Sequence, residues 1–231
     1  MAKYIPEVKG ILRRHVIQIP EVIREASGIR VFGKRLKSFI FSTDVAVIKN
    51  TNADAVIAVY PFTPQPMITQ AIVLSADIPV FCGVGGGITT AKRSINLALD
   101  AEFKGAMGVV VNSPIPNEVI TQMRETIDIP IVVSIVSEYE NFQERIQAGA
   151  TILNVCGAKE TVNIVKKIRE KYPNFPIIAT GGPCEETIRA TVNAGANAIT
   201  FTPPAASDIL SEIMSGHREK YAKENKDEYN Y

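Results

Sequence analysis

An internal repeat is the sequence feature that most constrains the fold of this chain. Residues 52–114 contain NADAVIAVYPF, IPVFCGVGGG and GVVVNSP, and residues 148–204 contain AGATILNVCGA, FPIIATGG and ANAITFTPP in the same order. In each copy an apolar strand leads into a helix, a short apolar run ends in glycines, and a second helix leads into another strand. Repeats of this length with alternating strand and helix indicate a βα array and exclude a sandwich or a helix bundle.

Eight short, apolar and β-branched runs are the candidate strands, and segments with helical period separate them. Each run is almost continuously apolar, which is typical of parallel strands that are covered on both faces. A single barrel needs roughly 200–250 residues, which fits this chain of 231 residues. We therefore predict an α/β fold, a (β/α)8 TIM barrel with a twofold internal repeat. The predicted strands are Phe39–Thr43, Ala55–Tyr60, Pro79–Cys82, Ala106–Val111, Ile131–Val136, Thr151–Val155, Pro176–Ala179 and Ala198–Phe201.

The chain is expected to divide into an N-terminal extension (residues 1–37), the barrel (38–216) and a charged C-terminal tail (217–231). Superposing the repeats aligns Phe39–Thr43 with Ile131–Val136 as the opening strand of each half. The short run Ile29–Phe32 then lies outside the barrel, and helices are predicted near Glu7–His15 and Glu21–Ser27. Two roles stay open for the extension: a cap on the barrel bottom, or a contact in a homo-oligomer.

Composition and charge argue against several classes of partner. The formal net charge is +1, which gives no electrostatic reason to expect nucleic acid or an anionic membrane. No uninterrupted apolar stretch reaches the roughly 18 residues of a membrane span, and the charged N-terminus does not resemble a secretory signal. Cys82, Cys156 and Cys184 show no CxxC spacing, which fits a reduced compartment. We expect a cytoplasmic protein with neither a nucleic-acid nor a membrane partner.

Glycines at the ends of two predicted strands are the strongest chemical signal. Gly83–Gly87 ends the third predicted strand, and Gly181-Gly182 ends the seventh. In a barrel these loops lie at the C-terminal face, where bare backbone N–H groups and helix N-termini favour a phosphate or carboxylate. Asn112 and Thr202 follow the next strand in each half and are suited to complete an anion cradle. The alternative is that the glycines only form tight turns where the strands converge.

The pattern PIIATGG…AGANAITFTPP resembles the seventh-to-eighth strand signature of the ribulose-phosphate-binding (β/α)8 barrel superfamily. That group includes phosphosugar isomerases, aldolases, decarboxylases and enzymes of tryptophan and histidine synthesis. The twofold repeat looks most like the histidine-biosynthesis barrels, in which each half carries a phosphate site. The resemblance covers residues 39 to about 214. It implies two phosphate sites: Gly181, Gly182 and Thr202, and, through the repeat, Gly86, Gly87 and Asn112.

The catalytic candidates are groups near the barrel mouth that can transfer a proton. The histidine-pathway barrels carry an Asp at the ends of the first and fifth strands; Asp44 fits the first place, whereas Glu138 lies just beyond the fifth strand. We predict Asp44 and Glu138 as acid and base, with Cys82 as a third catalytic candidate. The alternative is helix capping for the carboxylates and an inert buried thiol for Cys82. Cys156, after the sixth strand, is a thiol candidate with the same alternative.

Several other chemistries lack the residues that they need. There is no DxKxxD cluster of the orotidine-phosphate-decarboxylase type, and no lysine lies within a predicted strand for Schiff-base aldol chemistry. His15 and His217 lie outside the predicted barrel, which leaves no metal site and no Ser-His-Asp triad. The glycine run does not match the GxGxxG of a dinucleotide site. We therefore expect no metal and no cofactor.

Three functions stay open. The first is an enzyme of the lyase or isomerase type that acts on a small phosphorylated metabolite at the C-terminal face. The second is a non-catalytic protein that binds such a metabolite and regulates a partner. The third is a barrel whose glycines are structural and whose function lies in its oligomer surface. We favour the first, because sites at this face of the fold are usually catalytic, which is an argument from fold analogy.

Overall fold

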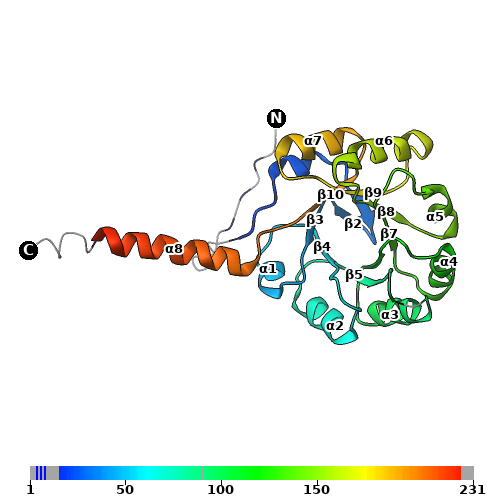
Figure 1. The fold of residues 1–231 in the computed structure, drawn as a ribbon, viewed down its shortest axis with the longest axis horizontal. Helices are drawn as coiled ribbons and strands as arrows, with labels where there is room; N and C mark the ends of the chain where they lie inside the picture. Colours follow the sequence, from blue (N-terminus) through cyan, green and yellow to red (C-terminus); the bar gives the residue numbers. More distant parts are fainter. Residues whose placement is uncertain (1–3, 5, 7, 9–15, 90, 225–231) are drawn as a thin grey trace, which may run out of the picture.

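The structure, a computed structural model, describes residues 16–89 and 91–224 together with residues 4, 6 and 8. Its centre is a closed barrel of parallel strands in the order β10-β3-β4-β5-β6-β7-β8-β9 (Figure 1). The barrel strands are β3 (Ser38–Phe41), β4 (Ala55–Ala58), β5 (Val80–Gly85), β6 (Gly108–Val111), β7 (Ile131–Ile135), β8 (Ile152–Val155), β9 (Ile177–Thr180) and β10 (Ala198–Phe201). The eight strands correspond to the eight predicted runs, so the predicted α/β barrel is confirmed.

Helices surround the barrel and connect successive strands (Figure 1). Local signals set several of their ends. Asp44 caps the first turn of the shortest α-helix, and Gly149 and Gly195 follow two others with φ of 120° and 108°, a region that favours glycine. The helices are α1 (Val45–Lys49), α2 (Pro66–Ser75), α3 (Ala91–Phe103), α4 (Asn117–Thr126), α5 (Phe142–Ala148), η2 (Ala158–Glu160), α6 (Thr161–Lys171) and α7 (Glu185–Asn193).

Strand side chains alternate between two separate cores, because successive residues of a strand point to opposite faces. One set packs outward against the helices and includes Ile40, Val109 and Leu153. The other set fills the inside of the barrel and contains no helix residue. Inside, the rings of Phe39 and Phe81 meet edge to face with centroids 5.3 Å apart. Side chains therefore fill the barrel interior at the level of these two rings.

A β-hairpin formed by β1 (Ile29–Val31) and β2 (Lys34–Leu36) precedes the barrel. Its turn is Phe32-Gly33, and both residues have positive φ (43° and 82°), as tight hairpin turns require. The apolar side chains of the hairpin are buried in the same cluster as the inner barrel residues. The hairpin therefore packs against the inner core of the barrel. The role of the extension, a cap or an oligomer contact, stays a prediction. The run at Ile29–Phe32 is a strand outside the barrel, as predicted.

The chain on both sides of the hairpin is held by Asp54, the residue before β4. The Asp54 carboxylate accepts hydrogen bonds from the backbone N–H groups of Lys37 and Ser38, at 2.8 and 3.0 Å. It also pairs with the Arg24 guanidinium at 2.9 Å. Burial raises the pKa of this carboxyl, but the hydrogen bonds from Lys37, Ser38 and Arg24 outweigh it, and the pKa is lowered. This group joins the N-terminal segment to the barrel.

The last helix, α8 (Ala206–Glu224), leaves the barrel and projects away from it (Figure 1). It runs continuously across residue 216, where the barrel was predicted to end. Within the described residues, no helix is both long and apolar enough to cross a membrane. Of the two helices predicted before the hairpin, the second is the 3-10 helix η1 (Glu21–Glu25), and the first falls mostly outside the described residues. The twofold repeat and the domain boundaries stay predictions.

The inner core gives a test of the fold. A Cβ atom added to Gly108 would lie 2.5 Å from the ring of Phe81, its partner across β5 and β6. Phe81→Ala should lower the free energy of unfolding by about 3–5 kcal/mol. Gly108→Ala should lower it by about 1–3 kcal/mol through overpacking. The double variant should lose less than the sum, because the new methyl group enters the space left by the ring; additive losses in urea denaturation would contradict this packing.

Candidate functional site

The upper end of the barrel interior is lined by uncharged polar side chains. Val110, Val132, Ile152, Ile178 and Ala198 point into the barrel, so the residue two positions after each of them points inward as well. Those residues are not apolar. Together with the thiol that follows β8, they form a surface that we name the polar arc: Asn112, Ser134, Asn154, Cys156, Thr180 and Thr200.

Hydrogen bonds join most members of the polar arc to one another. Ser134 Oγ donates to Asn112 Oδ1 at 3.4 Å, and Asn154 Nδ2 donates to Cys156 Sγ at 3.3 Å. Thr180 Oγ1 donates to the same sulfur at 3.5 Å. The register of the strands brings Ser134 beside Asn154 and Thr180 beside Thr200. The arc is therefore one continuous surface over five neighbouring strands.

Two polar atoms of this surface are buried without a hydrogen-bond partner. Asn154 and Thr200 are only 6% and 8% exposed, yet Asn154 Oδ1 and Thr200 Oγ1 have no partner among the described residues. A buried polar group without a partner costs about 1–3 kcal/mol, so such groups usually meet water or a ligand. These two atoms mark the part of the barrel interior that is suited to bind a polar ligand.

Cys156 is the one member of the polar arc with a titratable side chain. Burial raises the pKa of its thiol, and the hydrogen bonds from Thr180 and Asn154 oppose this only in part. The thiol therefore stays protonated at neutral pH. It is a proton donor rather than a ready nucleophile, because the thiolate is the nucleophilic form.

The opposite side of the mouth is apolar and opens into a pocket. Strand alternation turns Phe41, Val59 and Gly83 inward there. Beside them lies a pocket of about 150 Å³, which we name the glycine-loop pocket. Its lining includes Tyr60, Thr63, Gly85, Gly86, Thr89 and Asn112. Asn112 belongs to both surfaces, so the pocket and the polar arc are continuous.

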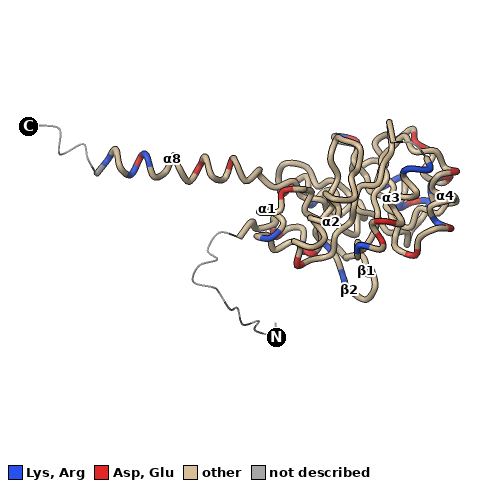
Figure 2. The backbone as a smooth tube through the Cα atoms, turned by 90° about the horizontal axis from the view of Figure 1, so that it is seen from below, with Lys and Arg blue, Asp and Glu red and all other residues tan. Residues whose placement is uncertain are grey.

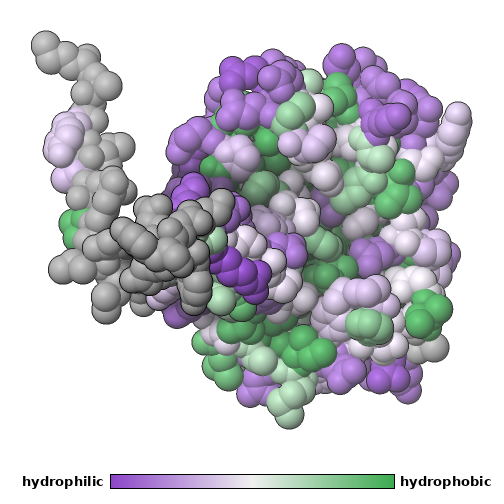
Figure 3. All heavy atoms as spheres, turned by 60° about the vertical axis from the view of Figure 1, so that its left-hand side comes forward, coloured by the Kyte–Doolittle hydropathy of each residue, from purple (hydrophilic) through white to green (hydrophobic). Residues whose placement is uncertain are grey.

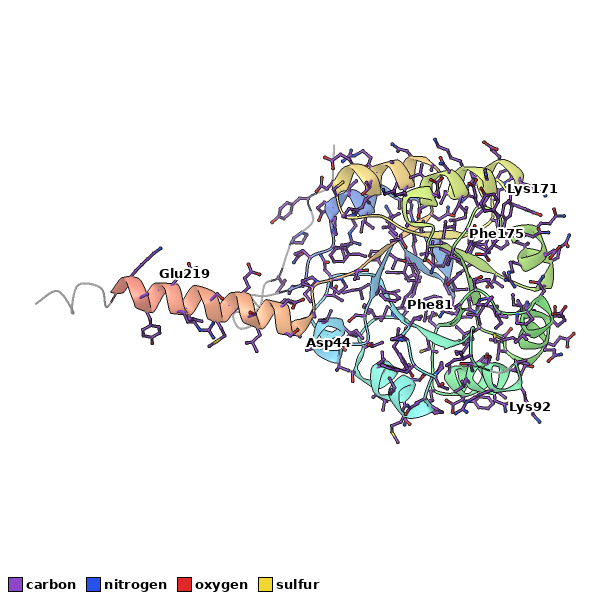
Figure 4. The ribbon with its side chains drawn as sticks, viewed as in Figure 1. Asp44, Phe81, Lys92, Lys171, Phe175 and Glu219 are labelled. Carbon is purple, nitrogen blue, oxygen red and sulfur yellow. The ribbon has the colours of Figure 1, made fainter. Side chains whose placement is uncertain are left out.

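The glycine loop after β5 is shaped by close backbone contact. Gly86 has a φ of +116°, and a Cβ atom there would lie 2.4 Å from the backbone oxygen of Asn112. Gly87 has a φ of +67° and nothing within 4 Å of its Cβ position, so it faces open space. The loop leads to α3, whose first turn carries Lys92 and Arg93 and no acidic residue. Figure 4 shows Lys92 at the periphery of this helix.

The second glycine pair has a different setting. Gly181 is packed in the core, where a Cβ atom would lie 2.7 Å from Ile199 and 2.8 Å from Ile188. Gly182 has a φ of +85° and lies against Thr187 of α7. The first turn of α7 carries Glu185 and Glu186, both exposed. These carboxylates already occupy the positive end of the helix and repel a bound anion. Thr202, the predicted partner, is exposed.

Each of the three predicted catalytic residues either pairs with another group of the protein or is buried. Asp44 lies at the start of α1 (Figure 4), where its carboxylate accepts from the N–H groups of Ala46 (2.8 Å) and Val47 (3.3 Å). Glu138 pairs with Lys167 of α6. Cys82 is buried between the strands and the helices, and burial raises its pKa to about 12. The structure does not bring these three groups together, and their catalytic roles stay predictions.

The sequence did not identify most of the polar arc. Of its six members, only Asn112, as a phosphate ligand, and Cys156, as a thiol candidate, were predicted. Strand periodicity was the available signal, but it identifies inward-facing positions only when the register is known to the residue. Among the described residues, no group of three His, Cys, Asp or Glu side chains lies close enough together to hold a metal ion.

Comparison with known proteins identifies the fold. No protein-family model and no curated protein matches the sequence. Among solved structures, phosphonopyruvate hydrolase in complex with oxalate and Mg²⁺ is 13% identical, with a TM-score of 0.58 over 84% of this chain and 83% of that chain. The 4-hydroxy-tetrahydrodipicolinate synthase of Methylacidiphilum fumariolicum SolV is 14% identical, with a TM-score of 0.59 over 73% and 68% of the two chains.

Thiamine phosphate pyrophosphorylase from Pyrococcus furiosus is 18% identical, with a TM-score of 0.54 over 71% of this chain and 88% of that chain. These similar structures are TIM-barrel enzymes of small metabolites, some of them phosphorylated by name. At such identities the likeness is one of fold. The chain is thus a TIM-barrel protein that resembles these enzymes only distantly.

The buried thiol of Cys82 predicts a pH dependence of stability. Its pKa is raised from 9.0 to about 12, so below pH 9 its contribution is fully present, and the contribution is lost as the pH rises towards 12. At about 1.4 kcal/mol per pKa unit, the loss should approach roughly 4 kcal/mol. We expect the stability of the wild type to fall more steeply over this range than that of Cys82→Ala, measured by urea denaturation. Parallel curves would contradict the predicted shift.

Proposed function

We propose that the barrel mouth binds a small phosphorylated metabolite. The phosphate would lie at the glycine loop after β5, and the uncharged, hydroxyl-bearing part would lie against the polar arc. The observation that carries the proposal is the pair of unpartnered buried atoms, Asn154 Oδ1 and Thr200 Oγ1. A ligand hydroxyl can donate to the first, and the Thr200 hydroxyl can donate to or accept from a second ligand oxygen.

The electrostatics of the mouth support this orientation. The polar arc carries no Lys, Arg or His to neutralise a phosphate inside the barrel, where an unpaired charge is costly. At the glycine loop, backbone N–H groups and the N-terminal end of α3 offer positive partial charge. The first turn of α3 holds Lys92 and Arg93 and no acidic residue, so no carboxylate of this turn opposes an anion. A phosphate is therefore more stable at Gly86 and Gly87, beside Asn112 at the edge of the arc, than at the other members of the arc.

We also propose a second anion site, of lower affinity, at the second glycine pair. The resemblance to the ribulose-phosphate-binding barrels and the twofold repeat imply a site at Gly181, Gly182 and Thr202. Glu185 and Glu186 beside this loop oppose an anion there. We therefore infer that the glycine-loop pocket is the principal anion site and that the second half has a much lower affinity.

Catalysis of the lyase or isomerase type is the first candidate activity. These reactions move a proton to or from the substrate, and Cys156 keeps its proton at the centre of the arc. Asp44 and Glu138 would act from the rim only after leaving their present partners. A regulatory binding protein is the second candidate, and the absence of any carboxylate, lysine or histidine from the arc favours it.

Gly87 offers a matched test of the anion site. Asp and Asn tolerate a left-handed φ, and the Cβ position at Gly87 is open, so both substitutions should fold. Inorganic phosphate, phosphorylated sugars and phosphorylated acids are screened by thermal shift; a ligand at 100 times its Kd stabilises by about 2.7 kcal/mol. We expect Gly87→Asn to retain binding and Gly87→Asp to weaken it at least tenfold, because the new carboxylate repels the phosphate.

Equal affinities of the two variants would mean that the phosphate does not bind at this loop. If no phosphorylated compound raises the melting temperature, the proposed function is overturned. The ligand that binds then decides between the two candidates. Its consumption by the wild-type protein assigns an enzyme. Binding without consumption assigns a regulatory protein.

Thr200 offers an independent test of the polar arc. Thr200→Val removes a hydroxyl that has no protein partner, so the free energy of unfolding should stay within about 1 kcal/mol of wild type or rise. Affinity for the phosphorylated ligand should fall at least fivefold, about 1 kcal/mol, because one hydrogen bond is lost. The control is Thr180→Val, whose hydroxyl already bonds Cys156 Sγ and whose loss should lower stability. Unchanged affinity of Thr200→Val, by titration calorimetry, would place the ligand elsewhere.

A further inference from the structure

The N-terminal segment takes part of the place of a last helix in the layer around the barrel. The N-terminal segment occupies the space beside α7, where η1 packs against that helix. Ile19, Val22 and Ile23 of this segment are buried in the same core as the strands and the other helices. An ion pair at 3.2 Å between Glu25 and Arg189 adds to the contact. The last helix packs against its own barrel only at its start, and its residues from Leu210 to Lys223 are exposed.

The projecting helix carries an apolar stripe on one side. Every residue from Leu210 to Lys223 is exposed. At 100° per residue, Leu210, Ile213, Met214 and Tyr221 fall within about 100° of the helix circumference. Leu210 is 60% exposed and Met214 is 43% exposed. A stripe of this kind on a helix of 19 residues is the pattern of a helix that packs against another surface.

A groove of about 520 Å³ lies where α8 leaves the barrel. It is lined by Ile17 of the N-terminal segment, by Ala46 and Val47 of α1, and by Ala206 and Ile209 of the first turn of α8. Figure 3, which looks at this side of the molecule, shows hydrophobic residues at the surface among polar ones. Because the first turn of α8 lines the groove, the rest of this continuous helix runs away from it. The later turns of its own α8 therefore cannot fill the groove without breaking the helix, whereas the α8 of a second copy can reach it.

Charge along α8 selects the direction of such a second helix. The first half carries Asp208 and Glu212 and no basic residue, whereas the second half is net positive (Figure 2). Its charged residues are Arg218, Glu219, Lys220, Lys223 and Glu224. Two copies side by side in opposite directions place each acidic half next to a half that carries the basic residues. Opposite directions also align the helix dipoles favourably. An antiparallel pair is therefore favoured over a parallel pair.

We propose that α8 is a dimerisation helix, by which two copies of this chain form a twofold-symmetric pair. The two α8 helices run antiparallel with their apolar stripes in contact. The second half of each helix lies at the groove at the base of the other. A helix of 19 residues is about 28 Å long, which is sufficient to reach from one base to the other. The contact is self-complementary, so it closes as a dimer and does not extend into a filament.

The prolines between β10 and α8 support the pairing of two copies. Pro203 and Pro204 fix φ near −65°, and Pro204 biases the residue before it towards an extended conformation. The link is therefore stiff and directs the helix outward. A helix that is held away from its own barrel loses little conformational freedom when it pairs with a second copy.

The test is the mass of the full-length protein in solution, measured by light scattering and sedimentation between 1 and about 100 µM. Met214→Glu places a charge in the stripe, and Ser215→Glu places the same charge on the neighbouring residue outside it. We expect the wild type and Ser215→Glu to be dimers and Met214→Glu to dissociate at least tenfold more readily. Circular dichroism should show the same helix content in all three.

A wild type that is monomeric at every concentration would overturn the proposal, as would equal dissociation of the two variants.

The relative direction of the two α8 helices is tested by disulfide formation in a Cys184→Ser background, which removes the exposed thiol. Met214→Cys, near the middle of the helix, should cross-link to its own copy in an antiparallel pair. Leu210→Cys should not, because its two copies lie too far apart for a disulfide. Cross-linking of both would mean parallel helices and would overturn the arrangement.

Discussion

The inward and outward alternation of side chains on the eight barrel strands is the constraint on which the rest of the structure depends. It produces an outer core against the helices and an inner core against which the hairpin packs. Two residues further along the strands, the same alternation turns Asn154 and Thr200 into the interior. Because of this alternation, the packed apolar core gives way to a polar surface only two residues further along these strands.

The absence of charged side chains from this polar surface has a direct physical consequence. A charged ligand group gains little from uncharged amides and hydroxyls deep in the barrel and must find its partners at the rim. There the glycine loop at Gly86 and Gly87 approaches the start of α3, which has basic rather than acidic residues in its first turn. The carboxylates of Asp44 and Glu138 are held by a helix end and a lysine.

The N-terminal segment takes part of the place of a last barrel helix, and this links the two ends of the chain. Asp54 anchors this segment through Arg24 and through the backbone at Lys37 and Ser38. Because the segment covers the outside of the barrel beside α7, α8 is released. An extension that takes part of this place therefore leaves free the helix through which we propose that two copies pair.

The sequence by itself determined the number, order and approximate limits of the strands, because continuous apolar runs and helix-ending glycines are local signals. It also located the glycine loops and placed Ile29–Phe32 outside the barrel. The site was only partly predictable: Asn112 and Cys156 of the polar arc were among the candidates, and Asp44, Glu138 and Cys82 were chosen by their nearness to strand ends. The roles of all these residues stay predictions. Only the tertiary structure decided which strand residues face inward and where α8 goes, since a shift of one residue reverses every side chain, and the path of a helix depends on what already covers the barrel.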